Sequence, residues 1–90
     1  MIKVKIPQPL RNLTDGKDEV SLEGNEIGEI LLELEKKYPG IKERLRDEEG
    51  KLRRFINIFV NGDDIRHLEG EATPVEERDE VSILPAIAGG

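Results

Sequence analysis

The chain contains no cysteine and no tryptophan, and it has only two phenylalanines and one tyrosine among its 90 residues. The absence of cysteine excludes disulfide bonds, thiolate metal sites and thiol nucleophiles. Because aromatic side chains are scarce, the hydrophobic core must be built from Ile, Leu and Val. A chain of this length forms a single domain, which has little room for both a packed core and a deep catalytic pocket.

Positive charge is also in short supply, because 14 Lys and Arg residues face 20 Asp and Glu residues and give a net charge of −6. Proteins bind nucleic acids and anionic membranes largely through clustered Lys and Arg side chains. We therefore expect neither nucleic acid nor a membrane as a partner. The acidic surface favours a basic groove on another protein, although charge that only keeps the domain in solution explains it equally well.

Long hydrophobic runs are missing as well. Residues 1–6 alternate apolar and charged side chains instead of forming an uninterrupted apolar stretch. This pattern is typical neither of a signal peptide nor of a membrane-spanning helix. We expect a cytoplasmic protein.

Alternation of apolar and polar residues predicts four β-strands, at residues 2–6, 19–23, 55–60 and 80–84. In the third strand the aliphatic, β-branched side chains share one face, which suits the core. The other face carries Phe55, Asn57 and Phe59. Asn61-Gly62 is the favoured dipeptide of a tight hairpin, because both residues tolerate positive φ. We expect Ile65 to lie on a short return strand.

An apolar stripe with helical spacing predicts one long helix and is made of Ile27, Ile30, Leu31, Leu34 and Tyr38. Asn25 is the expected N-cap, Pro39-Gly40 ends the helix, and residues 41–46 add one further turn. The element order β-β-α-β-β-β predicts an α+β roll. In this roll the helix lies across one face of a mixed four- to five-stranded sheet, and the first strand lies beside the last.

The sequence ends in Gly89-Gly90, preceded by the small apolar residues Ala86-Ile87-Ala88. We expect a folded domain at residues 1–84 and a flexible tail at residues 85–90. A frayed end is the simplest explanation of terminal glycines. However, a terminal carboxylate that enters another enzyme's active site needs a slim leader, and glycine has no Cβ. An ionised carboxylate is a poor electrophile, so an ATP-dependent partner would have to activate it as an acyl-adenylate.

Three runs of the sequence resemble a known family: residues 81–90, the helix exit at residues 33–40 and the hairpin at residues 57–62. The first run, Val-Ser-Ile-Leu-Pro-Ala-Ile-Ala-Gly-Gly, is similar to the ending of the molybdopterin-synthase small-subunit and thiamine sulfur-carrier (MoaD/ThiS) family. This resemblance covers nearly the whole chain and implies a ubiquitin-like β-grasp fold. Arg78 departs from the family pattern, which often has Gly at this place. The type of the turn before the last strand is therefore undetermined from the sequence.

Residues 54–61, 64–66 and 83–90 look most like the sulfur carriers of the thiocarboxylate-dependent cysteine biosynthesis route. The resemblance implies a carrier that is not an enzyme and binds no cofactor. An E1-like enzyme would adenylate Gly90 with ATP and convert it to a thiocarboxylate, and Gly89 would give access to the partner's active site. The sulfur would then attack an aminoacrylate on a cysteine synthase homologue, a pyridoxal-phosphate enzyme. After an acyl shift from sulfur to nitrogen, a metalloprotease would release cysteine.

The expected partner-binding residues lie in the tail leader and on the outward face of the third strand: Phe55, Phe59, Leu84, Pro85, Ala86, Ile87 and Ala88. Aromatic residues on an open sheet face are typical anchors of an interface. As an alternative, Phe55 or Phe59 packs beneath the loop at residues 68–75 as a small satellite of the core.

Two other functions fit the same tail. One is a protein modifier that forms isopeptide bonds with lysines, since the archaeal ubiquitin-like modifiers share much of the pattern. The other is the small subunit of molybdopterin synthase, whose tail inserts into the large catalytic subunit. A stand-alone enzyme is disfavoured, because His67 is the single histidine and a hairpin turn explains Asp63-Asp64. We expect no metal site.

Overall fold

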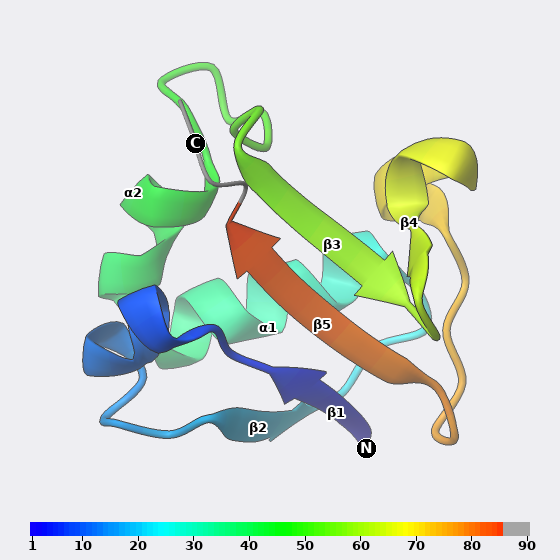
Figure 1. The fold of residues 1–90 in the computed structure, drawn as a ribbon, viewed down its shortest axis with the longest axis horizontal. Coiled ribbons are helices and arrows are strands. Elements are labelled where there is room, and N and C mark those ends of the chain that lie inside the picture. Colours follow the sequence, from blue (N-terminus) through cyan, green and yellow to red (C-terminus); the bar gives the residue numbers. More distant parts are fainter. Residues whose placement is uncertain (86–90) are drawn as a thin grey trace.

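The computed structural model describes residues 1–85, which form a five-stranded sheet and one long helix (Figure 1). The strands are β1 (Ile2–Lys5), β2 (Glu19–Leu22), β3 (Ile56–Val60), β4 (Asp63–Asp64) and β5 (Glu80–Pro85). The helices are α1 (Ile27–Lys37) and the single turn α2 (Lys42–Leu45), accompanied by short 3₁₀ segments. This arrangement confirms the expected α+β roll and its element order.

The strand order in the sheet is β2-β1-β5-β3-β4. The two central strands, β1 and β5, run parallel, and every other pair is antiparallel. The predicted placement of the first strand beside the last is therefore confirmed. Because β1 ends early, it pairs only with residues 80–82 of β5, whereas β3 pairs with residues 81–85.

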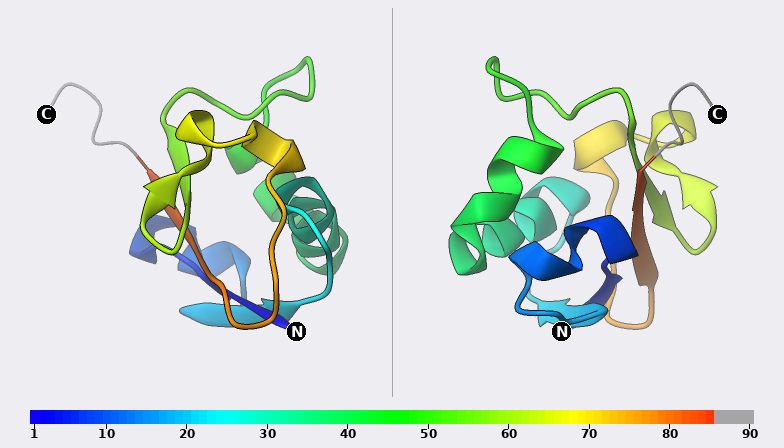
Figure 2. Two further views of the ribbon diagram at one scale, coloured as in Figure 1. Left: turned by 90° about the vertical axis from the view of Figure 1, so that its right-hand side faces the viewer. Right: turned by 60° about the vertical axis from the view of Figure 1, so that its left-hand side comes forward.

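The core lies between α1 and one face of the sheet, and it is aliphatic as the composition requires. The predicted stripe of α1 is buried, and Ile27, Ile30, Leu31 and Leu34 have no exposed surface. Alternate residues of the strands meet this stripe, such as Ile58 and Ile83, each 1% exposed. Helices α1 and α2 lie on the same side of the sheet (Figure 2), which leaves the opposite face of β3 and β5 open.

The predicted N-cap at Asn25 is wrong. The N-cap of α1 is Glu26, whose backbone is extended, and no side chain caps the helix there. Asn25 is held one residue too early, because its carbonyl oxygen accepts a hydrogen bond from the N–H of Val75 at 2.9 Å. Its own backbone N–H donates to Oε1 of Glu29 at 2.7 Å.

The predicted return strand through Ile65 is also wrong. Strand β4 contains only two residues, and Ile65 begins a 3₁₀ turn that runs to His67. The Asp64 carboxylate caps this turn by accepting the Arg66 N–H at 2.8 Å. The turn places the Ile65 side chain in the core, where it is 4% exposed. A 3₁₀ segment at Gln8–Leu13 fills the loop of the first hairpin and was not predicted.

The turn at the far end of β3 follows the predicted hairpin, with positive φ at Asn61 and Gly62. The Asn61 side chain joins this turn to the one before β5. It donates to the Asp79 carboxylate at 2.9 Å and accepts from the Glu80 N–H at 2.9 Å. Arg78, in the second turn, does not adopt a positive φ, so this turn has no need of the glycine that is common in the family.

A partly buried ion-pair network that the sequence did not reveal joins α1 to the loop before β3 and to the 3₁₀ segment Gly70–Ala72. The Arg46 guanidinium contacts the Glu35 carboxylate at 2.7 Å and the Glu71 carboxylate at 2.8 Å. The pKa of Arg46 is raised above its usual value, chiefly by its hydrogen bond with Glu71. Within residues 1–85, no helix is long and apolar enough to cross a membrane.

Candidate functional site

The end of β5, which leads to the predicted tail, is paired with β3 along one edge and unpaired along the other. Pro85, its last residue, lies opposite Ile56 of β3, and Leu84 lies opposite Asn57. On the other side, pairing with β1 stops at Ser82. Leu84 is 48% exposed. The predicted tail residues Ala86, Ile87, Ala88, Gly89 and Gly90 lie outside the described residues.

The predicted docking residues Phe59 and Leu84 share the open face of the sheet, whereas Pro85 lies on the face of Ile83 and Ile56. Phe59 lies opposite Ser82, two pairs along from Asn57 and Leu84 and therefore on the same face of the sheet. Phe55, just before β3, is 45% exposed, and Phe59 is partly exposed. Neither ring belongs to the hydrophobic core. We call Phe55, Phe59 and Leu84 the apolar patch.

Sequence reasoning missed an arginine that fixes this part of β3. Because β4 is short, the outer edge of β3 is left without a strand near its start. The Arg66 guanidinium takes that place, donating to the carbonyl oxygens of Arg54 at 2.9 Å and Ile56 at 3.0 Å. It also donates to the side-chain oxygen of Asn57. The signal in the sequence would have been a polar residue soon after a short return strand, which is too common to be specific.

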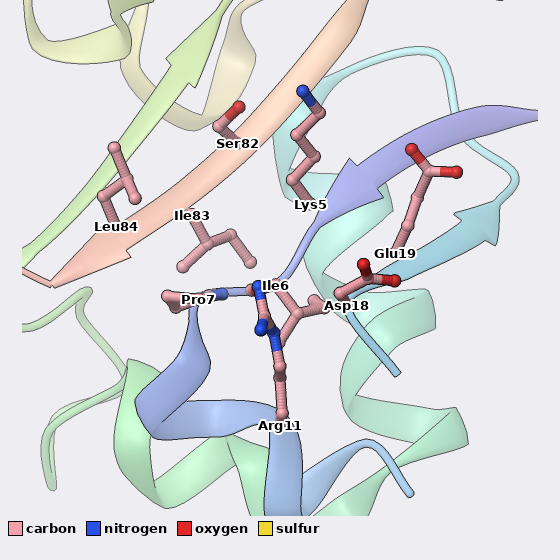
Figure 3. Close-up of a pocket in the computed structure, with 9 residues that line it drawn as sticks. All are labelled: Lys5, Ile6, Pro7, Arg11, Asp18, Glu19, Ser82, Ile83 and Leu84. Atoms are coloured by element: carbon pink, nitrogen blue, oxygen red, sulfur yellow. The ribbon is translucent and has the colours of Figure 1, made fainter. Parts of the chain in front are cut away.

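A shallow groove of about 370 Å³ lies beside the free side of β5 (Figure 3). Lys5, Arg11 and Leu84 are among the residues that line it. The Arg11 Nε donates to the carbonyl oxygen of Ile6 at 3.1 Å, and Lys5 forms an ion pair with Glu80 at 3.0 Å. The two basic groups of the groove are therefore engaged by their own neighbours.

The other candidate site residues considered from the sequence are surface or turn residues. His67 and Asp63 are exposed, and Asp64 caps its own turn. Within residues 1–85, no group of three or more His, Asp or Glu side chains is arranged to hold a metal ion. The chemistry that the described part of the chain can offer is recognition: an apolar patch, flanked by arginines, at the root of the tail.

The comparisons with known proteins agree with one another. Residues 4–90 match the model of the ThiS family. The sulfur carrier protein CysO of Mycobacterium tuberculosis is 47% identical over 91 residues, which cover 99% of this chain and 98% of that protein.

Among solved structures, the Amycolatopsis orientalis BexX/CysO complex contains a chain that superposes with a TM-score of 0.90, at 43% identity and 100% coverage of both chains. The small archaeal modifier protein 1 of Methanosarcina acetivorans has a TM-score of 0.85 at 40% identity, with 99% of this chain and 95% of that chain covered. These neighbours confirm the β-grasp fold. The chain therefore belongs to the ThiS family, as a small ubiquitin-like sulfur carrier protein.

Proposed function

We propose that this carrier holds sulfur as a thiocarboxylate on Gly90 and supplies it for the biosynthesis of cysteine. The observation that carries this proposal is the similarity to CysO, a named sulfur carrier, along nearly the whole of both chains. The Gly89-Gly90 ending provides the carboxylate and the slim leader that such chemistry needs.

The proposed loading has two steps, and both take place on an E1-like enzyme that uses ATP. The Gly90 carboxylate attacks the α-phosphorus of ATP, and pyrophosphate leaves to give an acyl-adenylate. Hydrosulfide, or a donor at the same oxidation level, then attacks the carbonyl carbon, and AMP and a proton leave to give the thiocarboxylate. The carrier is a co-substrate in this scheme, since its own residues supply the carboxyl group and the docking surface.

The proposed delivery uses the thiocarboxylate sulfur as a nucleophile. It attacks the aminoacrylate on a cysteine synthase homologue, a pyridoxal-phosphate enzyme. The acyl group moves from sulfur to the cysteine nitrogen, and a metalloprotease hydrolyses the new amide bond. Cysteine is released, and the Gly90 carboxylate is restored for another cycle.

The geometry of the described residues supports partner docking at the root of the tail. The apolar patch surrounds the last residues of β5, so an enzyme that receives the tail would also cover Phe55, Phe59 and Leu84. Partly exposed aromatic residues in such a position are suitable anchors. We propose that Pro85 and the leader Ala86-Ile87-Ala88 continue this contact into the partner's active site.

The intact mass of the protein purified from its own cells tests the function. Conversion of the carboxylate to a thiocarboxylate adds the mass difference between sulfur and oxygen. We expect this increase in the full chain and its loss in a variant that lacks Gly90. If incubation with ATP, the activating enzyme and a sulfide source yields neither the mass increase nor a covalent conjugate, the proposal is wrong.

A second candidate function is protein modification, and the similarity to the archaeal modifier of Methanosarcina acetivorans favours it. The acyl-adenylate is common to both functions, but here a lysine amine would attack it and form an isopeptide bond. Immunoblots would then show conjugates of higher mass that disappear when Gly90 is deleted. Conjugates without any thiocarboxylate would favour the modifier.

A further inference from the structure

The two ends of the β3–β5 ladder differ in charge. Three arginines, Arg53, Arg54 and Arg66, lie at the end where the tail leaves the sheet, and we call them the arginine patch. Its place is fixed by the register, because Ile56, two residues after Arg54, lies opposite Pro85. The Arg66 guanidinium binds the carbonyl oxygens of both Arg54 and Ile56.

The three arginines are prepared for recognition in different ways. Arg66 is held in place by its hydrogen bonds to the edge of β3. The Arg53 guanidinium lies 6.0 Å from the centroid of the Phe55 ring, and its Nε donates to the Glu43 carbonyl oxygen at 2.9 Å. Arg54 is exposed, and its side chain has no hydrogen-bond or ion-pair partner within residues 1–85. The patch thus joins two positioned guanidinium groups to one that is available.

Acidic residues near the patch already have partners. The Asp64 carboxylate lies 3.8 Å from the Arg66 guanidinium, and others are engaged in the loop before β3. The Asp47 carboxylate accepts hydrogen bonds from the N–H groups of Glu49 and Lys51, at 2.9 and 3.1 Å. Glu49 forms an ion pair with Lys51 at 3.5 Å. These contacts partly neutralise the loop. Because Asp64 pairs with Arg66, the available positive charge of the arginine patch comes mainly from Arg53 and Arg54.

The opposite end of the ladder is acidic. It contains the two turns joined by the Asn61 side chain, with the exposed residues Asp63, Glu76, Glu77 and Glu80. The six residues of β5 separate the two ends by roughly 20 Å, whereas the Debye length at physiological ionic strength is about 8 Å. Charges at the acidic end are therefore largely screened from a partner at the tail.

We propose that the enzyme that activates the tail presents carboxylate side chains around the mouth of its site, and that these dock on the arginine patch. This inference rests on the proposed function and replaces the basic partner groove that the net charge of −6 favours. The charge near the tail, and not the net charge of the whole chain, determines which partner surface fits. Charges at the rim of an interface act over short distances and mainly change the rate of association.

Arginines also bind phosphate, so the nucleotide is a competing ligand of the same chemistry. Five residues follow Pro85, so with Gly90 at the α-phosphate a fully extended tail would hold the patch about 17 Å from the nucleotide. An extended tail therefore favours the partner's carboxylates over ATP as the ligand of the patch. The experiment distinguishes the two sources by the substrate whose KM changes.

The test measures ATP–pyrophosphate exchange by the activating enzyme of the same organism at low and high salt. Arg54→Glu reverses the charge of the available arginine, Arg54→Gln removes it, and Arg78→Glu is the matched control at the acidic end. We expect Arg54→Glu to lower kcat/KM for the carrier about tenfold at low salt. Arg54→Gln should have a smaller effect, both effects should shrink at high salt, and Arg78→Glu should change little. Thermal unfolding confirms that each variant is folded.

Several outcomes would overturn the inference. An unchanged or faster exchange with Arg54→Glu would show that the partner's rim is not acidic there. A change confined to the KM for ATP would assign the patch to the nucleotide. If the wild-type chain supports no exchange at all, the proposed function fails and the inference fails with it. A loss seen only in the Arg54 variants would uphold the inference and the adenylation step on which it rests.

Discussion

The two faces of the sheet carry different chemistry, although their residues alternate along the same strands. On β3, Ile58 points into the core and is 1% exposed, whereas its neighbour Phe59 lies on the open face. On β5 the same contrast separates Ile83 from Leu84, which are 1% and 48% exposed. Stability therefore depends mainly on one face, and the other is free to serve recognition at the root of the tail.

The largest effect is expected on the covered face. Ile58→Ala removes a fully packed side chain from the middle of β3 and leaves a cavity beneath α1. We expect the free energy of unfolding to fall by about 4 kcal/mol, as measured by urea denaturation. A loss below about 1 kcal/mol would contradict the difference between the two faces, because it would mean that the covered face is not tightly packed.

The next largest effect is expected at the ion pairs beside the core. Arg46→Met leaves the Glu35 carboxylate, which is 7% exposed, without its counter-charge. We expect a loss of about 3 kcal/mol in the free energy of unfolding. The double variant Glu35→Gln/Arg46→Met should regain part of this loss, because no unpaired buried charge remains. The control is Arg44→Met, an exposed residue of α2, and equal losses in Arg46→Met and Arg44→Met would contradict the structural role of the network.

The division between the faces could be predicted from the sequence, because a period of two in a strand and of 3.6 in a helix directly reports which side chains are buried. This pattern located the β3 and β5 faces and the α1 stripe. It could not locate the contacts of Arg46 or Arg66, since both arginines lie in irregular segments between the periodic elements. It also misplaced the N-cap, because a contact with the distant Val75 holds Asn25. The assignments of Gly89 and Gly90 stay predictions that rest on the sequence and the family.

A smaller effect is expected on the open face. Phe59→Ala removes a partly exposed ring that lies outside the core. We expect the free energy of unfolding to fall by less than about 1.5 kcal/mol. Replacing a buried phenylalanine with alanine typically costs roughly 3–5 kcal/mol. The KM of the carrier for its activating enzyme should rise. A large stability loss with an unchanged KM would assign Phe59 to the fold instead of to docking.

The smallest effect is expected at the acidic end, which belongs to neither face. The hydrogen bond from the Asn61 side chain, with help from the Glu76 N–H, lowers the pKa of Asp79 below its usual value. A carboxyl group whose pKa is lower in the folded protein than in the unfolded chain stabilises the fold above its unfolded pKa of about 3.9. That contribution disappears as the pH falls through the folded pKa. The stability difference between the wild type and Asp79→Asn should therefore stay constant from about pH 7 to pH 5 and shrink below about pH 4. A difference that persists unchanged down to about pH 2 would show that the Asn61–Asp79 hydrogen bond does not depend on the charge of the carboxylate.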